Sequence, residues 1–167
     1  MGLRQALSQE LVRQRGLSSA TPIPVVVSDS GLELAIDFLA IDSLGCSFEQ
    51  LALTVSALNG AAFPVLKTWA DQLSRRITYL LEQIGPLEYD EQAGEVLIRS
   101  TPPDQLPDGA QYYEILLQSQ QGGRFVLRRY RSVKGQSGRT PAALTMTHEV
   151  LLKLTEDLVD TLPMGTP

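Results

Sequence analysis

The hydrophobic positions between Phe63 and Pro86 recur at steps of three and four residues, the spacing of one face of an α-helix. The apolar side consists of Leu66, Trp69, Ala70, Leu73, Ile77, Leu80, Leu81 and Ile84. Pro64 suits a first helical turn, and Gly85 followed by Pro86 is a typical stop signal. The pattern predicts a long central helix over about residues 64–84, roughly 30 Å long at 1.5 Å per residue.

The segment before this helix has the period of β-strands. Residues 32–42 alternate between apolar and polar side chains, which indicates a half-buried strand, and 25–27 form a shorter strand before a turn. Residues 46–58 are ambiguous, because Ser47 and Gln50 form a helical capping box while the residues around Val55 alternate like a strand. We favour the strand, since the turn before it is typical of a hairpin.

The segment after the central helix has the pattern of two hairpins. Residues 87–100 read as one hairpin, and 112–119 with 124–132 as a second whose turn contains Gly122 and Gly123. The proline-rich residues 101–109 and the glycine-containing residues 134–140 are expected to be loops.

The two ends of the chain carry helical patterns. Residues 1–16 form an N-terminal helix with a thin apolar stripe, and because 18–24 have the composition of a linker we expect that helix to be loosely attached. A C-terminal helix begins near Thr147. The expected architecture is a single α+β domain over residues 23–162, followed by a frayed tail at 163–167. Its antiparallel sheet of roughly five to seven strands packs against the 64–84 helix.

Composition narrows the class of protein. The chain has 167 residues, of which 43% are hydrophobic, as in an ordinary domain with one core. One cysteine excludes an intrachain disulfide, and one cysteine with one histidine predicts no metal site. We also expect no cofactor. The sequence has neither a signal-peptide pattern nor a membrane-spanning apolar run, so we expect a cytoplasmic protein without a membrane partner.

The formal net charge of −5 argues against a protein that coats nucleic acid, but the charge is unevenly distributed. Between Arg124 and Arg139 there are six basic residues and no acid. The candidate binding residues are Arg128, Arg129, Arg131, Lys134, Arg139 and Tyr130. They could hold a polyanion, with tyrosine stacking on a base, or bind an acidic protein partner. The alternative, which we favour, is that these arginines pair across strands with Glu114, Glu33 and Asp37.

No catalytic residue is predicted. Cys46 could act as a nucleophile with His148 as its base, yet a lone cysteine is more often a small buried hydrophobe. Residues 135–140 (GQSGRT) look like a phosphate loop but lack the spacing of one. An enzyme of unidentified class therefore ranks last among the functions considered.

The order helix, strands, helix, strands, helix in an acidic chain resembles that of small acidic secretion chaperones. This resemblance implies a dimer that binds an extended segment of a partner, and it assigns no residues. We therefore expect a non-catalytic protein-binding, adaptor or chaperone-like module whose partner is another protein or a second copy of itself. The alternative is binding of nucleic acid or another polyanion through residues 124–139.

Overall fold

A computed structural model describes residues 2–80, 84–100, 104–120 and 122–163 of the chain. The described residues form one antiparallel sheet and three short helices. The strands are β1 (Ser18–Asp29), β2 (Leu32–Ile41), β3 (Gly45–Val55), β4 (Ile84–Asp90), β5 (Glu95–Ser100), β6 (Asp104–Leu106), β7 (Gly109–Gln118), β8 (Arg124–Val133), β9 (Thr140–Ala142) and β10 (Leu144–Thr147).

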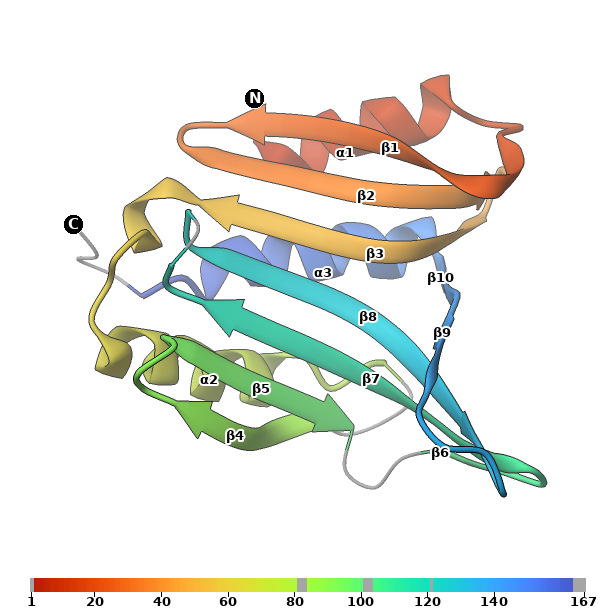
Figure 1. The fold of residues 1–167 in the computed structure, drawn as a ribbon. Helices are drawn as coiled ribbons and strands as arrows, with labels where there is room; N and C mark the ends of the chain where they lie inside the picture. Colours follow the sequence, from red (N-terminus) through yellow and green to blue (C-terminus); the bar gives the residue numbers. More distant parts are fainter. Residues whose placement is uncertain (1, 81–83, 101–103, 121, 164–167) are drawn as a thin grey trace.

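The main path of the sheet runs in the order β1-β2-β3-β8-β7-β5-β4 (Figure 1). The two hairpin-rich halves of the chain meet where β3 pairs with β8 in antiparallel register, with Leu51 opposite Leu127. Short strands β6, β9 and β10 add to the ends of β7, β8 and β3. The central strands are therefore hydrogen-bonded on both sides, and β1 and β4 are the edges of this path.

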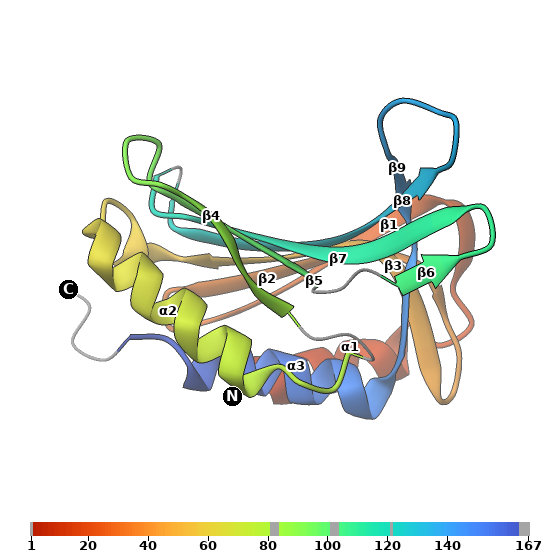
Figure 2. The ribbon, with the colours of Figure 1, turned by 90° about the horizontal axis from the view of Figure 1, so that it is seen from below.

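The helices lie on one face of the sheet (Figure 2). They are α1 (Leu3–Arg13), α2 (Phe63–Arg76) and α3 (His148–Asp160), and a single 3₁₀ turn, η1 (Ser56–Leu58), follows β3. Trp69 of α2 is fully buried and packs against Phe125 of β8, with ring centroids 6.1 Å apart. The core thus fills the space between the helices and this face.

The predicted long central helix over residues 64–84 is wrong, and with it the fold class. Helix α2 ends at Arg76, and Ile84 begins strand β4, where it pairs with Ser100 of β5. Ile77 and Leu80 are buried, so the apolar pattern continues after the helix itself has ended. The fold is a mostly antiparallel sheet with short helices, rather than a sheet built on one long helix.

Three local predictions have different outcomes. The strand interpretation of residues 46–58 is confirmed as far as Val55, where β3 ends. The predicted linker at 18–24 is wrong, because these residues belong to edge strand β1. Its prolines are tolerated there since an edge strand has one side without ladder bonds. The predicted loop at 101–109 contains β6, which pairs with β7, while residues 101–103 lie outside the described residues.

The first helix packs on the body of the protein. Leu3, Leu7 and Leu11 are each at most 3% exposed, and Arg4 of α1 forms an ion pair with Glu156 of α3. The N-terminus of α3 is capped by the Thr147 hydroxyl, which accepts a hydrogen bond from the backbone N–H of Val150 at 3.2 Å. Residues 164–167, most of the segment expected to be frayed, lie outside the described residues.

The two hairpins predicted after the central helix are confirmed. β4 pairs with β5, and β7 pairs with β8. Gly123 has a φ of 72°, and a Cβ there would stand 2.6 Å from the carbonyl oxygen of Val55, so the turn requires glycine. Among the helices of the described chain, none is long and apolar enough to cross a membrane.

Candidate functional site

Strand β8 shows how the sheet divides its side chains between two faces. Phe125 and Leu127 are fully buried under the helices, while Arg124, Val126 and Arg128 point to the opposite side. No helix of the described chain covers that opposite side, which we call the open face (Figure 2). Arg128 is exposed there.

An apolar row crosses the open face at right angles to the strands. The strand registers place one small or apolar residue of each strand directly beside the next: Ala35 of β2, Ala52 of β3, Val126 of β8, Leu116 of β7 and Leu97 of β5. Val26 of edge strand β1 extends the row and is 53% exposed. The row is the apolar floor of the open face. Its two central residues, Ala52 and Val126, are only 3% and 6% exposed, so the other residues of the row supply its accessible part.

Polar rows flank this floor on both sides. One row consists of Glu33, Thr54, Arg124, Gln118 and Glu95. The other consists of Asp37, Gln50, Arg128, Glu114 and Arg99. An apolar centre with a polar border is the usual composition of a protein-binding surface.

Two adjoining hollows lie along the floor, and both are lined by Leu116. The first, of about 250 Å³, is bounded by Val126, Arg124 and Arg128 of β8. The second, also of about 250 Å³, is bounded by Leu97 and by carboxylates of β4 and β5, including Glu95. The floor is therefore recessed from β8 to β4, with arginines at one end and acids at the other.

A cluster of arginine and tyrosine side chains surrounds Glu114 at one border. Arg99 Nη2 lies 3.2 Å from the Glu114 carboxylate, and Arg139 pairs with the same carboxylate. The guanidinium of Arg139 also stacks on Tyr130, 3.7 Å from its ring centroid, and that of Arg99 on Tyr112 at 4.9 Å. These contacts, led by the hydrogen bond to Glu114, raise the pKa of Arg139, so its charge is fixed.

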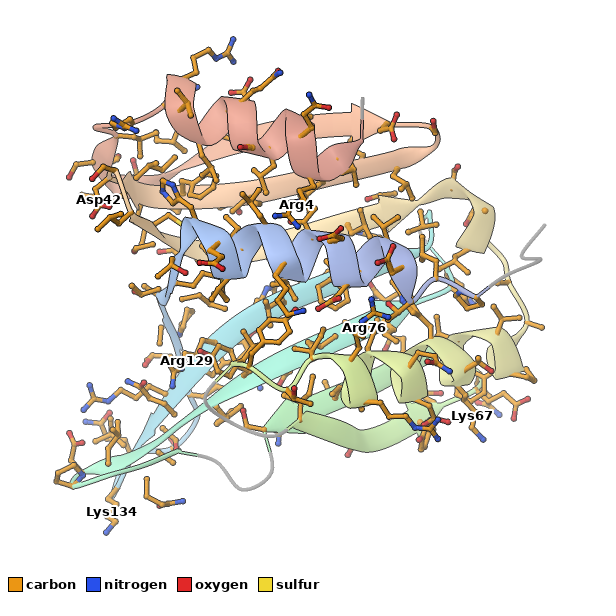
Figure 3. All side chains as sticks on the ribbon, turned by 180° about the vertical axis from the view of Figure 1, so that it is seen from behind. Arg4, Asp42, Lys67, Arg76, Arg129 and Lys134 are labelled. Atoms are coloured by element: carbon orange, nitrogen blue, oxygen red, sulfur yellow. The ribbon has the colours of Figure 1, made fainter. Side chains whose placement is uncertain are left out.

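The structure brings together only some of the six predicted binding residues. Arg128, Tyr130 and Arg139 meet on the open face, where Arg128 Nη1 lies 3.3 Å from the Tyr130 hydroxyl. Arg129 and Arg131 point to the helix-covered face, as Figure 3 shows for Arg129, which stacks on Tyr113. Lys134 is exposed directly after β8, in the segment that leads to β9. The basic segment therefore does not form one surface.

Of the three predicted acidic partners, the described chain shows ion pairs to Glu114 alone. Its partners include Arg99, which sequence reasoning did not include because it lies outside the basic segment. Leu97 and Leu116 of the apolar floor were also missed. The sequence does indicate these two leucines, because β5 and β7 carry apolar residues on both faces. A strand with one solvent-exposed face would alternate between apolar and polar residues.

Cys46 and His148 do not form a catalytic pair. The Cys46 thiol donates to the Met146 carbonyl at 3.7 Å, and His148 Nε2 lies 3.0 Å from the Gly45 carbonyl oxygen. Burial, together with the charge of Asp42, raises the pKa of Cys46 to about 12, so the reactive thiolate is scarce at neutral pH. Asp42 itself has a lowered pKa, because it accepts hydrogen bonds from the backbone N–H groups of Gly45 and Leu44.

A buried carboxylate joins α2 to α3. Asp157 is 2% exposed and accepts hydrogen bonds from Arg76 Nε at 3.0 Å and from the Tyr79 hydroxyl at 2.6 Å. Burial and this hydrogen bond raise the pKa of Tyr79. Arg76 lies between the two helices in Figure 3. Because Asp157 is buried and its carboxylate is held by Arg76 and Tyr79 from within the fold, we assign the group a structural role.

A further cleft of about 480 Å³ lies where η1 meets the C-terminal end of α3. Leu32, Leu58 and Leu162 line it, and Asp160 is the one charged residue among its described lining. Asp160 already pairs with Arg76 at 3.3 Å. Nowhere in the described chain do three or more His, Cys, Asp or Glu side chains gather as metal ligands would.

Comparisons with known proteins give no relative. No family model, curated protein or solved structure matches this chain.

Proposed function

We propose that this protein is a non-catalytic protein-binding module of the adaptor or chaperone-like kind, and that it binds its partner on the open face of the sheet. The observation that carries the proposal is the apolar floor from Ala35 to Leu97, which crosses five strands on a face that no described helix covers. An apolar surface with a polar border is typical of an interaction site.

The chemistry of the open face favours a macromolecular partner over a small substrate. The hollows beside Leu116 are about 250 Å³ each, below the roughly 300–1,000 Å³ of small-molecule pockets, and they line up along the floor. Their charged groups are arginines and carboxylates, without a nucleophile and base within reach of each other among the lining residues. The proposed setting is the cytoplasm, where the partner is another protein or a second copy of this chain.

Polyanion binding is the second candidate. It is supported by the four arginines that share the open face, namely Arg99, Arg124, Arg128 and Arg139, with Tyr112 and Tyr130 close by. The ion pairs of Glu114 with Arg99 and Arg139 weaken it, because those guanidiniums are already engaged.

Site-specific photocrosslinking tests the first proposal. A photoreactive phenylalanine analogue replaces Leu116 on the floor, and in a matched control it replaces Gln72, which is exposed on helix α2. In the source cells we expect protein adducts from position 116 that position 72 does not give. Equal adducts at both positions, or none at 116 and at a second floor position, 97, would contradict the proposal.

A further inference from the structure

We propose that the occupant of the open face is an amphipathic helix of the partner protein, lying along the apolar floor and carrying a basic, an acidic and a basic residue at steps of seven. This inference rests on the proposed function and names its partner. It follows from the hydrogen bonding of the sheet, from the length of the floor and from the order of charges beside it.

The hydrogen bonding of the sheet selects a helix. Strands β2, β3, β8, β7 and β5 each pair on both sides, so their backbone groups are engaged within the sheet. An extended segment laid on this face would leave its own N–H and C=O groups unpaired over Val126 and Leu116, at a cost in free energy. A helix satisfies its backbone internally and presents only side chains, which is the helix-in-groove mode of recognition.

The length of the floor fits a short helix. From Ala35 to Leu97 the floor crosses four strand spacings of about 4.8 Å, or about 19 Å. At 1.5 Å per residue this length corresponds to about 13 residues of helix. The hollows beside Leu116 can receive two of its apolar side chains.

The charges beside the floor alternate in sign at a helical repeat. Along one border Glu33 of β2, Arg124 of β8 and Glu95 of β5 are separated by the uncharged Thr54 and Gln118. Successive charges are thus two strands apart, about 9.6 Å, which is close to the roughly 10.5 Å covered by seven helical residues. Positions seven apart lie on the same side of a helix, so one helix edge can meet all three charges.

Two of these three charges are not engaged elsewhere in the described structure. Neither Glu33 nor Arg124 has a salt-bridge partner among the described residues. Glu95 accepts a hydrogen bond from Gln118 at 2.8 Å, which leaves its charge uncompensated. On the opposite border, Asp37 and Arg128 repeat the acidic and basic order on β2 and β8, whereas Arg99 on β5 has the opposite sign to Glu95. Complementary charges therefore select the order of charges along the helix.

Two synthetic helical peptides of about 18 residues, long enough to cover the floor, test the inference. They share one apolar stripe. The matched peptide carries Lys, Glu and Lys at steps of seven along its border, and the reversed peptide carries Glu, Lys and Glu. Binding is measured by fluorescence anisotropy at low salt, with the full-length protein and with its charge-reversed variant E33K/R124E/E95K, whose folding is checked by circular dichroism.

We expect the wild-type protein to bind the matched peptide at least about tenfold more tightly than the reversed one, because three attractive pairs replace three repulsive ones. The charge-reversed variant should invert this preference. Equal binding of both peptides, or no binding of either, would overturn the inference. Photocrosslinking at position 116 would still decide the proposed function, since it makes no assumption about charge order or helicity.

Discussion

The hydroxyl of Tyr79 donates a hydrogen bond of 2.6 Å to Asp157, a carboxylate that is 2% exposed. Tyr79 belongs to the segment that the sequence pattern assigned to the central helix, yet here it lies after the end of α2 and faces α3. This contact, with that of Arg76, couples the end of α2 to α3. The position of the segment therefore depends on a residue 78 positions away in the chain.

Removing the Asp157 carboxylate should destabilise the fold. In D157A the Tyr79 hydroxyl loses its acceptor and Arg76 loses a buried partner, so we expect the free energy of unfolding to fall by about 2–4 kcal/mol. Urea denaturation measures this change in the free energy of unfolding. The matched control is D71A, an exposed carboxylate of α2, which should change stability by less than about 0.5 kcal/mol. Similar values for the two variants would contradict the structural role of Asp157.

The raised pKa of Tyr79 predicts a loss of stability at alkaline pH. The folded pKa lies above the ordinary value of 10.0, so above that pH the unfolded state releases the proton while the folded state keeps it. The contribution of Tyr79 is therefore complete below pH 10 and declines as the pH rises beyond it. The difference in unfolding free energy between wild type and Y79F should shrink from about pH 9 to pH 11. A constant difference across that range would refute the assignment.

Cys46 should react slowly with iodoacetamide. Its pKa is raised from 9.0 to about 12 and its side chain is buried, so the thiolate is both rare and shielded. At about pH 8 we expect alkylation at least a hundredfold slower than that of a free thiol. The double variant C46A/L44C places the thiol at a position that is 79% exposed and should react like a free thiol. Fast labelling of Cys46 would contradict its raised pKa and make it a candidate nucleophile.

Neighbouring residues of β7 should differ in their effect on stability. Ile115 is fully buried beneath the helices, so I115A should cost about 2–4 kcal/mol. Leu116 is half-buried on the open face, and L116A should cost about 1 kcal/mol or less. Urea denaturation of both variants compares the two faces directly. An equal cost would mean that the free chain covers its open face.

Heparin affinity separates the arginines by face. R124E/R128E changes the open face and R129E/R131E the helix-covered face, with the same change in net charge. If the protein binds proteins, retention of the wild type should be weak. The first variant should lower it more than the second, because Arg129 stacks on Tyr113 and Arg131 pairs with Asp108 within the fold. Strong retention that falls steeply with salt, is abolished in R124E/R128E and is kept in R129E/R131E would favour the polyanion function.

Many of the strands could be predicted from the sequence, because their patterns involve residues close together in the chain. The alternation of residues 32–42 fixed which side chains of β2 enter the core, and Gly122 and Gly123 marked the turn between β7 and β8. The apolar spacing of Leu66, Trp69 and Leu73 likewise located α2. In each case the period of the side chains, or the φ of a glycine, follows from residues close together in the chain.

The errors arose where a distant strand decided between two local structures. Residues 77–84 keep helical apolar spacing, but β5 supplies a pairing partner to Ile84, and Gly85 and Pro86 suit an edge strand as well as a helix end. The proline-rich residues 18–24 were taken for a linker, although β2 gives them a strand position. A short apolar segment has no strong preference of its own, so tertiary pairing decided its structure.

The sequence by itself determined the composition of the candidate surface: its arginines and carboxylates, and the alternation that points Val126 and Arg128 the same way. Only the tertiary structure decided which of these residues meet. Side-chain alternation assigns a face within one strand, but the strand order and register set the neighbours across strands, and these depend on contacts between residues far apart in the chain. The apolar floor from Ala35 to Leu97 exists only in that order.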